Sequence, residues 1–322
     1  MHLGIDISKD SLDCYRLTEK SAKRFSNDER STGALVSWLG TDTELHVVME
    51  ATGVYWRACA FALYQQGVKV SVVNPAQVKY FARSHLRRGK TDSMDAELLA
   101  HYAQTMQPEP WQPASLCFEE LKLLVRERDD LVTQLGQLRN QLHAHQHRQH
   151  CPDTLLNLLR ERIKLLKAQR EALDQAIAQH CEKTCSNVYE SLRSVPGIGP
   201  VAASVLLAEA AGLDTFEHPK QLTAFAGISP APNQSGAFIG HSSISKIGNP
   251  RIRKAFYMAA LQAERHSVFK NLYERLIKKG KKPKVALIAV ARKLLVIAFA
   301  LVKSKQLFDP DHLAKPKALT TP

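Results

Sequence analysis

The sequence predicts an α/β domain at the N-terminus, a long helical hairpin, and a mainly helical C-terminal domain. Short apolar segments with the length of buried strands punctuate roughly the first hundred residues. Two leucine-rich series with helical spacing follow, and a turn containing two glycines then joins further helical segments. We therefore expect domains at residues 1–108, 109–186 and 187–322, with the proline-rich stretch 108–113 as the first boundary.

The first domain is expected to alternate strands and helices. Thr52-Gly53 opens one predicted helix. Another is expected to begin after Lys90, where Thr91 or Asp92 can cap it. Four segments have the pattern of strands: His2–Ile7, Ser11–Leu17, Leu45–Met49 and Val68–Val73, the last closed by Asn74-Pro75.

Four carboxylates stand where these elements begin or end. Asp6 and Glu50 leave strand ends, and Asp92 and Asp95 share a face of the first turn of a helix. Carboxylates brought together cannot all stay ionised without cations, so the set predicts a divalent-metal site suited to phosphodiester chemistry. Taken singly, Asp92 would be an N-cap and Asp6 a turn residue. The prediction depends on the combination of the motifs GIDISK, MEATG and KTDSMDA.

The composition is typical of a cytoplasmic globular protein. No run reaches the eighteen or more apolar residues of a membrane span, and the N-terminus leads directly into a predicted strand without a signal-peptide pattern. The six cysteines are scattered and form no CxxC pair, as expected for reduced thiols. We therefore expect a cytoplasmic location.

The positive charge is concentrated in one region. The formal net charge is +13, yet residues 241–305 alone contain sixteen Lys and Arg residues against two Asp and Glu. Such an excess favours a polyanionic partner, most simply nucleic acid, whose binding depends on salt. A pair of well-solvated helices is the alternative explanation.

Two apolar series predict a pair of long helices joined near Pro152. Arg128 interrupts the first series and Arg170 the second. The helices are expected to form an antiparallel coiled coil or a dimerisation hairpin, and a bundle purely within one chain is the alternative. The repeating positions are Leu121, Leu124, Leu131, Leu135, Leu138 and Leu142, then Leu156, Leu159, Ile163, Leu166, Leu173 and Ile177.

A histidine-rich segment, His143–His150, lies between the two series. It could bind zinc or nickel, but it offers no clear tetrahedral ligand set, so a polar loop tip is the favoured interpretation. Cys181 and Cys185 lie one helical turn apart without a second pair, and we interpret them as structural.

The third domain begins with a turn of the helix-hairpin-helix type. Gly197 and Gly199 stand within Ser194–Ala203, where glycine lets backbone N–H groups approach a phosphate. An ordinary tight turn between helices is the alternative. Basic residues around the start of a later helix are expected to bind a phosphate backbone: Lys246, Arg251, Arg253 and Lys254.

Ser235 lies in a Gly- and Pro-rich loop that could present its hydroxyl to a substrate. On the residues alone, a role in the turn is favoured. Ser242, Ser243 and Ser245 lie close to it in the sequence.

Together these motifs resemble those of the transposases of insertion-sequence family one-hundred-ten, the DEDD-type serine recombinases that work with a bridge RNA. The resemblance covers nearly the whole chain, and the motifs occur in family order: GIDISK, MEATG, Asn74–Ala76, KTDSMDA, SVPGIG, AFAGISP and Gln234-Ser235-Gly236. It implies a RuvC-like (RNase H-like) first domain and a transposase-specific third domain. It also implies that Ser235 is the nucleophile and that the acidic tetrad is Asp6, Glu50, Asp92 and Asp95.

The resemblance further implies a mechanism. Ser235 would attack a DNA phosphate and form a 5′-phosphoserine link, aided by magnesium, or manganese in its place, at the tetrad. The implied partners are donor and target DNA, a structured guide RNA, and other subunits of a bacterial dimer or tetramer. A RuvC-like structure-selective endonuclease, which needs only the tetrad, and a non-catalytic nucleic-acid-binding protein remain as alternatives.

Overall fold

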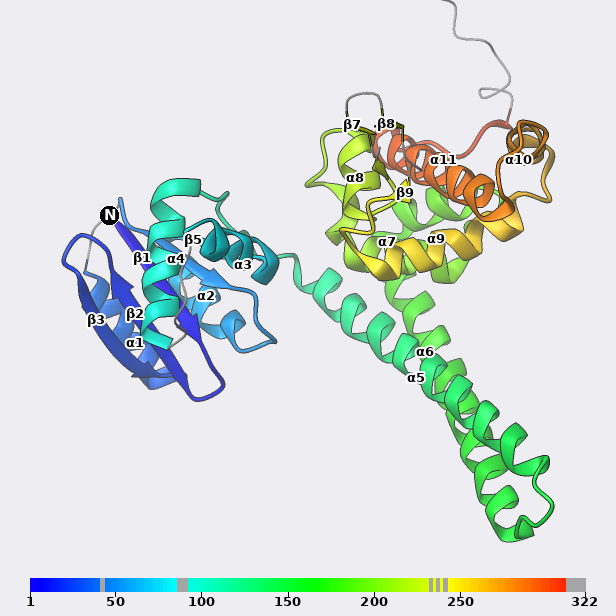
Figure 1. Ribbon diagram of the computed structural model, residues 1–322, viewed down its shortest axis with the longest axis horizontal. Coiled ribbons are helices and arrows are strands. Elements are labelled where there is room, and N and C mark those ends of the chain that lie inside the picture. Colours follow the sequence, from blue (N-terminus) through cyan, green and yellow to red (C-terminus); the bar gives the residue numbers. More distant parts are fainter. Residues whose placement is uncertain (41–43, 86–91, 232–233, 236–237, 240–242, 311–322) are drawn as a thin grey trace, which may run out of the picture. The chain divides into compact units, whose positions relative to one another are not determined.

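The computed structural model describes residues 1–40, 44–85, 92–231, 234–235, 238–239 and 243–310. The chain divides into two compact units, Met1–Pro113 and Ala114–Pro322 (Figure 1). The first unit therefore ends within the proline-rich stretch, and the helical hairpin groups with the C-terminal helices.

The first unit is built on a five-stranded sheet with strand order β3-β2-β1-β4-β5. Strands β1, β4 and β5 run parallel, and β2 and β3 are antiparallel additions beside β1. The four predicted strands are confirmed, whereas β3, an edge strand with mostly exposed side chains, was not predicted. The strands are β1 (His2–Ile7), β2 (Ser11–Arg16), β3 (Ser21–Ser26), β4 (His46–Glu50) and β5 (Lys69–Val73).

Helices cover both faces of this sheet. On one face α1 (Glu29–Leu39) and α2 (Trp56–Gln65) join a core with Leu3, Ile5 and Met49. On the other, α3 (Pro75–Ser84) and α4 (Asp92–Met106) pack with Val48 and Val73. Successive strand residues face opposite ways, so β4 contributes Val47 and Met49 to the first core and Val48 to the second.

Helix α3 was missed because Asn74-Pro75 was interpreted only as the end of a strand. Asn74 is the N-cap of α3: its side chain accepts a hydrogen bond from Ala76 N, Gln77 completes a capping box, and Pro75 occupies the first turn. Asparagine followed by proline is a common helix start, and the sequence carried that signal.

The second unit begins with the predicted hairpin, α5 (Leu116–Gln146) and α6 (Asp153–Arg193). Leu135 and Leu138 of α5 pack with Leu159 and Ile163 of α6, so the two helices pair within one chain. The hairpin projects from the helical body (Figure 1). Helix α6 continues through the expected boundary at residue 186, although its backbone leaves helical geometry at Cys185.

The rest of the second unit is mainly helical. Its core includes Leu206 of α7, Phe256 of α9 and Leu294 of α11, together with Leu121 from the base of the hairpin. Two short β-pairs lie between α8 and α9: β6 with β9, and β7 with β8. The elements are α7 (Pro200–Glu209), η1 (Ala211–Leu213), α8 (Pro219–Phe225), β6 (Pro230–Ala231), β7 (Gln234–Ser235), β8 (Phe238–Ile239), β9 (Ser243–Ile244), α9 (Pro250–Ala263), α10 (Ser267–Lys278) and α11 (Pro283–Ser304).

Helix α11 is long and apolar enough, by length and composition, to cross a membrane, because only Arg292 and Lys293 interrupt its apolar run. Half of its most apolar window is buried inside the second unit. Leu287, Val290 and Leu294 are among its residues in the core. Its apolar character is accounted for by this packing.

Candidate active site and nucleic-acid groove

Asp6 and Glu50 lie side by side on one face of the sheet. In the parallel pair β1–β4, Gly4 stands beside Val48, so two residues further along the strands Asp6 stands beside Glu50. Residues two apart point to the same face, and neighbouring strands are about 4.8 Å apart. Val48 shares a core with Leu99 of α4. Both carboxylates therefore belong to the face that α4 covers.

Helix α4 begins at the same edge. Its end is followed by Pro108, whose carbonyl accepts a hydrogen bond from Ser71 Oγ (2.9 Å). Ser71 Oγ also bonds the imidazole of His46, at the first residue of β4 (2.8 Å). Helix α4 therefore ends near the amino end of β4. Its first turn lies near the carboxyl ends of β1 and β4, where Asp6 and Glu50 are.

A close contact fixes this helix on β1. A Cβ atom on Gly4 would lie 2.0 Å from the carbonyl oxygen of Ala96 and 2.5 Å from the amide of Ala100. Only glycine lets the helix backbone rest directly on the strand. Asp95 immediately precedes this contact, so the first turn of α4, with Asp92 and Asp95, lies next to the ends of β1 and β4.

The donor set suits a hard divalent cation, since carboxylate oxygens are the ligands such ions prefer. Thr52 Oγ1 donates a hydrogen bond to Glu50 Oε1 (2.7 Å), which orients that carboxylate. The side chain of Asp92 lies outside the described residues. Within the described part of the chain, no three Asp, Glu, His or Cys side chains converge closely enough to hold an ion. Asp6, Glu50 and Asp95 share an edge, and their metal-binding role stays a prediction.

A further carboxylate, Asp13, stands opposite Asp6 in the antiparallel pair β1–β2. Arg24 of β3 binds it through Nε (2.7 Å) and Nη2 (2.9 Å). A bidentate guanidinium compensates the charge of the carboxylate and fixes its orientation. Asp13 is therefore a useful comparison for Asp6, because the two lie opposite each other on adjacent strands and the position of Asp13 is accounted for by its contact with Arg24.

Ser235 lies on an insert between α8 and α9, residues 227–248. It ends β7 and pairs in register with Phe238 of β8, which places it next to the turn of a small hairpin. Its side chain lies outside the described residues, as do Ser242 and the helix cap proposed at Thr91. The structure thus gives the backbone position of the predicted nucleophile and not the direction of its hydroxyl.

The neck of the insert is tied down at several points. Ser245 N donates to Ser229 O (3.0 Å), and Lys246 N donates to Gly227 O (3.1 Å). Arg253 Nη1 donates to the carbonyls of Ala226 (3.1 Å) and Lys246 (3.3 Å). Arg253 therefore braces the neck from the first turns of α9, and a phosphate contact by Arg253 or Lys246 stays a prediction.

The predicted glycine turn joins α6 to α7, and its two glycines differ. Gly197 has φ +95°, and a Cβ atom there would lie 2.6 Å from Ala263 Cβ on α9. Gly199 is the N-cap of α7, and a Cβ atom there would meet nothing within 4 Å. Gly197 therefore holds the turn against α9, while Gly199 leaves the start of α7 accessible.

A groove of about 540 Å³ opens beside this turn. Its floor is apolar, and includes Val201 and Met258. It brings together four of the six residues predicted to bind nucleic acid: Gly197, Gly199, Arg251 and Lys254. Arg128 and Arg170 of the hairpin also line it, and their only signal in the sequence was that each interrupts an apolar helical series.

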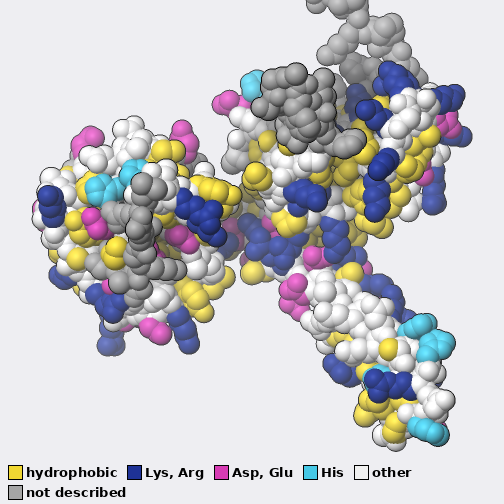
Figure 2. Space-filling view, viewed as in Figure 1, with side chains coloured by type: hydrophobic (Ala, Val, Ile, Leu, Met, Phe, Trp, Pro, Cys, Tyr) yellow, Lys and Arg dark blue, Asp and Glu magenta, His cyan; other side chains and the backbone are white. Residues whose placement is uncertain are grey.

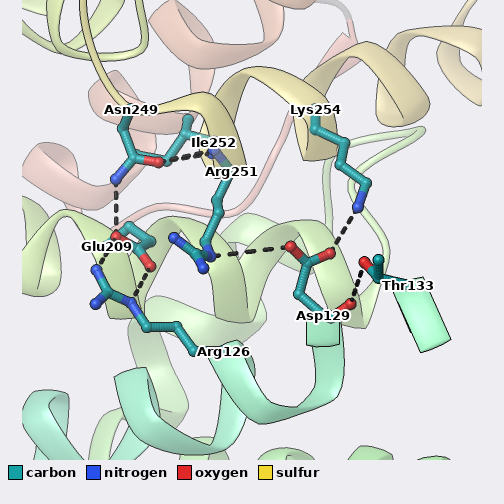
Figure 3. A network of polar contacts seen from close by, with 8 residues as sticks. All are labelled: Arg126, Asp129, Thr133, Glu209, Asn249, Arg251, Ile252 and Lys254. Atoms are coloured by element: carbon teal, nitrogen blue, oxygen red, sulfur yellow. Dashed lines mark hydrogen bonds and ion pairs between the residues drawn. The ribbon is translucent and has the colours of Figure 1, made fainter. Parts of the chain in front are cut away.

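Ion pairs connect the hairpin to α9 in this region (Figure 3). Asp129 lies between two cations: Lys254 Nζ is 2.6 Å from its Oδ1, and Arg251 Nε is 3.8 Å from its Oδ2. Figure 2 shows Lys and Arg side chains gathered near the base of the hairpin.

A second network fixes the start of α9. Asn249, its N-cap, accepts from the amides of Arg251 (2.9 Å) and Ile252 (3.2 Å) and donates to Glu209 Oε2 (2.8 Å). Glu209 is buried and accepts two hydrogen bonds from Arg126, at 3.0 and 3.1 Å. Burial raises the pKa of Glu209, but the hydrogen bonds from Arg126 and Asn249 outweigh it, so the pKa lies below its ordinary value.

Two family models match the chain: the DEDD transposase model of IS110 elements over residues 3–150, and the model described as "Transposase IS116/IS110/IS902 family" over residues 189–274. Pilin gene-inverting proteins of Moraxella lacunata and Moraxella bovis are 31% identical over 320 residues, covering 96% of this chain and 97% of theirs. The chain belongs to the IS110 family of transposases. The transposase for insertion sequence element IS1111A of Coxiella burnetii is 24% identical, over 95% of this chain and 90% of its own length.

As a member of this family the chain is a DNA transposase, and the two matches fall on the two regions described above. The first covers the acidic edge of the sheet and helix α5 of the hairpin. The second covers the glycine turn, the insert with Ser235 and the start of α9. The expected family resemblance is therefore confirmed.

Two smaller predictions concern the hairpin of the transposase. At its tip, His143 Nε2 and His147 Nε2 are 3.2 Å apart, but the described residues supply no third ligand there. Cys181 is fully buried in the core, and the described cysteines are all free thiols. The interpretations of these segments as a polar loop tip and as structural cysteines stay predictions.

Proposed function

We propose that this transposase cuts and rejoins DNA through a serine-linked intermediate, with Ser235 as the nucleophile and a divalent cation, Mg²⁺, bound by Asp6, Glu50, Asp92 and Asp95. The first domain would then have the RuvC-like fold. The observation that carries the proposal is the common edge of β1, β4 and α4, to which two strands and one helix start bring all four acidic positions. Family membership and the position of Ser235 beside a hairpin turn support it.

The chemistry of the serine step balances without an external energy source. Ser235 Oγ forms a bond to a DNA phosphorus, the bond from that phosphorus to the 3′ oxygen breaks, and the hydroxyl proton passes to the departing 3′ oxygen. A 3′ hydroxyl of another strand later attacks the phosphoserine, reforms the phosphodiester and returns the proton to serine. The cation would supply stabilisation of negative charge at the phosphate.

The residues of the chain would divide the remaining work. The neck of the insert, braced by Arg253, would hold the serine hairpin in place. Gly199, Arg251 and Lys254 would contact the phosphate backbone, and Gly197 would hold the turn that positions them. We propose that target choice comes from base pairing with a structured guide RNA, because the sequence of the basic C-terminal region contains no obvious base-reading motif and its Lys and Arg residues can bind backbones. The active form would be a cytoplasmic dimer or tetramer.

The test is incubation of the full-length protein with the RNA encoded beside its gene, donor DNA, target DNA and Mg²⁺. We expect a covalent protein–DNA adduct that is lost in Ser235→Ala and in Asp6→Ala but retained in Ser243→Ala. An adduct that persists in Ser235→Ala would remove the nucleophile assignment. Cleavage with no adduct would favour the structure-selective endonuclease. Omitting the RNA separates guided from unguided activity.

A further inference from the structure

The groove between the hairpin and α9 contains more cationic groups than its own carboxylates satisfy. Among the residues that the structure describes, four cationic side chains line it, Arg128, Arg170, Arg251 and Lys254, against one acidic side chain, that of Asp129. Lys254 and Arg251 share Asp129. The local charge is therefore positive on a surface that also presents the accessible start of α7.

The arginines of the hairpin share a carboxylate in the same way. Arg128 Nε lies 2.5 Å from Asp174 Oδ1, and Arg170 Nε lies 3.7 Å from Asp174 Oδ2. Each carboxylate thus holds one cation closely and a second at long range. Correspondingly, the Nε atoms of Arg170 and Arg251 are buried without a hydrogen-bond partner within the described residues.

Phosphate fits what these contacts leave unsatisfied. Its non-bridging oxygens accept two parallel hydrogen bonds from a guanidinium, as a carboxylate does. The Nε atoms of Arg251 and Arg170 are buried and reach Asp129 and Asp174 only at 3.8 and 3.7 Å. A strand entering the groove would therefore approach the terminal nitrogens of these guanidinium groups, of which Arg170 Nη2 also lies 3.4 Å from Glu171 Oε1. The apolar floor, with Val201 and Met258, can accept the less polar sugar edge of such a strand.

We propose that this groove binds a phosphodiester backbone, that Arg128 and Arg170 of the hairpin contact it together with Arg251 and Lys254, and that Asp129 and Asp174 compete with the phosphates. The inference rests on the proposed function, since it names the partner of the same region. The hairpin would then take part in nucleic-acid binding, which its leucine pattern does not indicate. Asp129 and Asp174 would lower the affinity for the nucleic acid.

The test exploits the fact that either partner of an ion pair can be removed. Binding of the full-length Asp6→Ala protein is measured against a mixed-sequence DNA duplex, the matching single strand and an RNA hairpin, across a range of salt concentrations. We expect Arg128→Gln and Arg170→Gln each to weaken binding about tenfold and to lower the salt slope by about 1. Asp129→Asn and Asp174→Asn are expected to tighten binding about three- to tenfold. Arg139→Gln, an exposed hairpin substitution outside the groove, is the matched control.

The direction of the affinity change in the Arg variants and in the Asp variants decides the outcome. If the ion pairs only hold the hairpin to the body, the Asp and Arg variants will weaken binding alike, and the inference is wrong. The inference is also wrong if the variants change the affinity for none of the three nucleic acids. It is wrong as well if the variants change self-association of the protein and leave the affinity unchanged. The probe that responds most identifies the strand as DNA or RNA. The adduct is measured separately, with the same groove variants made in the otherwise unchanged protein. Unchanged binding together with a normal adduct would overturn only this inference, whereas the expected binding effects with no adduct even from the unsubstituted protein would count against the serine mechanism.

Discussion

Arg126 of the hairpin and Glu209 of α7 form a bidentate ion pair in which the glutamate side chain is buried and the arginine side chain is 42% exposed. The pair connects elements 83 residues apart and, through Asn249, reaches the first turn of α9. Because the two side chains differ in burial, removing Arg126 should lower the unfolding free energy by a different amount from removing Glu209.

Arg126→Gln should cost more stability than Glu209→Gln. The first leaves a buried carboxylate without its cation, which costs about 3 kcal/mol of unfolding free energy. The second leaves a guanidinium that water can reach, and glutamine still accepts from Asn249, so we expect about 1 kcal/mol. Urea unfolding at neutral pH measures both. Equal losses, or the reverse order, would contradict this account of the burial.

Asp6→Asn and Asp13→Asn should separate a catalytic carboxylate from a structural neighbour. The two residues face each other in the β1–β2 pair, and Arg24 holds Asp13 through two hydrogen bonds. We expect Asp6→Asn to reduce cleavage of donor DNA by about 10²-fold or more, and Asp13→Asn to leave most of the activity. Single-turnover cleavage, normalised to folded protein, gives the comparison. Similar losses of cleavage in both variants would argue that Asp6 and Asp13 are both structural.

Gly4→Ala should be severely destabilising. The new methyl group would meet the backbone of α4 at 2.0 Å, and neither the strand nor the helix has a flexible side-chain end that could give way. We expect a loss of about 3 kcal/mol or more together with loss of activity. Gly33→Ala in α1 is the control, because nothing lies within 4 Å of its Cβ position. That change should stabilise the protein by about 0.5–1 kcal/mol. Thermal unfolding of the pair tests the contact.

His46 should make the first unit sensitive to mild acid. Burial, with the nearby charges of Lys69 and His2, lowers the pKa of His46 to about 4. In the unfolded chain its pKa is about 6.5. The unfolded state therefore binds the extra proton first, and this contribution to stability is complete above pH 6.5 and declines as the pH falls towards 4.

The loss should approach about 3 kcal/mol at the acid end of that window. The unfolding free energy is measured between pH 4 and pH 7 in the wild type and in His46→Gln, whose amide can still donate to Ser71. The variant should show a shallower decline. If both proteins lose stability in parallel, His46 is not the group responsible.

The sequence predicted the buried parts of this fold better than its exposed parts. The strands around Ile5, Val48 and Val70 were found because their apolar runs are continuous. Strand β3 was missed because Phe25 is its one buried residue, which leaves no alternation to detect. The leucine spacing predicted the hairpin, whereas the choice between pairing within a chain and pairing between chains required the packing itself.

The residues of the candidate site stay predictions, and the sequence could locate them without showing how they are arranged. Motifs could locate the acidic positions, but their common edge follows from the parallel register of β1 and β4 and from the contact at Gly4, neither of which is local in sequence. Arg253 resembled its basic neighbours until its hydrogen bonds to Ala226 and Lys246 distinguished it. Arg128 and Arg170 were noticed as interruptions, and only the folded hairpin showed that both line the groove.

The first turns of α9 carry two kinds of side chain a few residues apart. Arg253 grips the neck of the serine hairpin, and Arg251 and Lys254 line the groove. A helix moves as a rigid rod over so short a length, so a strand that shifted this end of α9 would carry the serine hairpin with it. Under the proposed function, the first turns of α9 would therefore couple nucleic-acid binding in the groove to the position of Ser235 within one subunit.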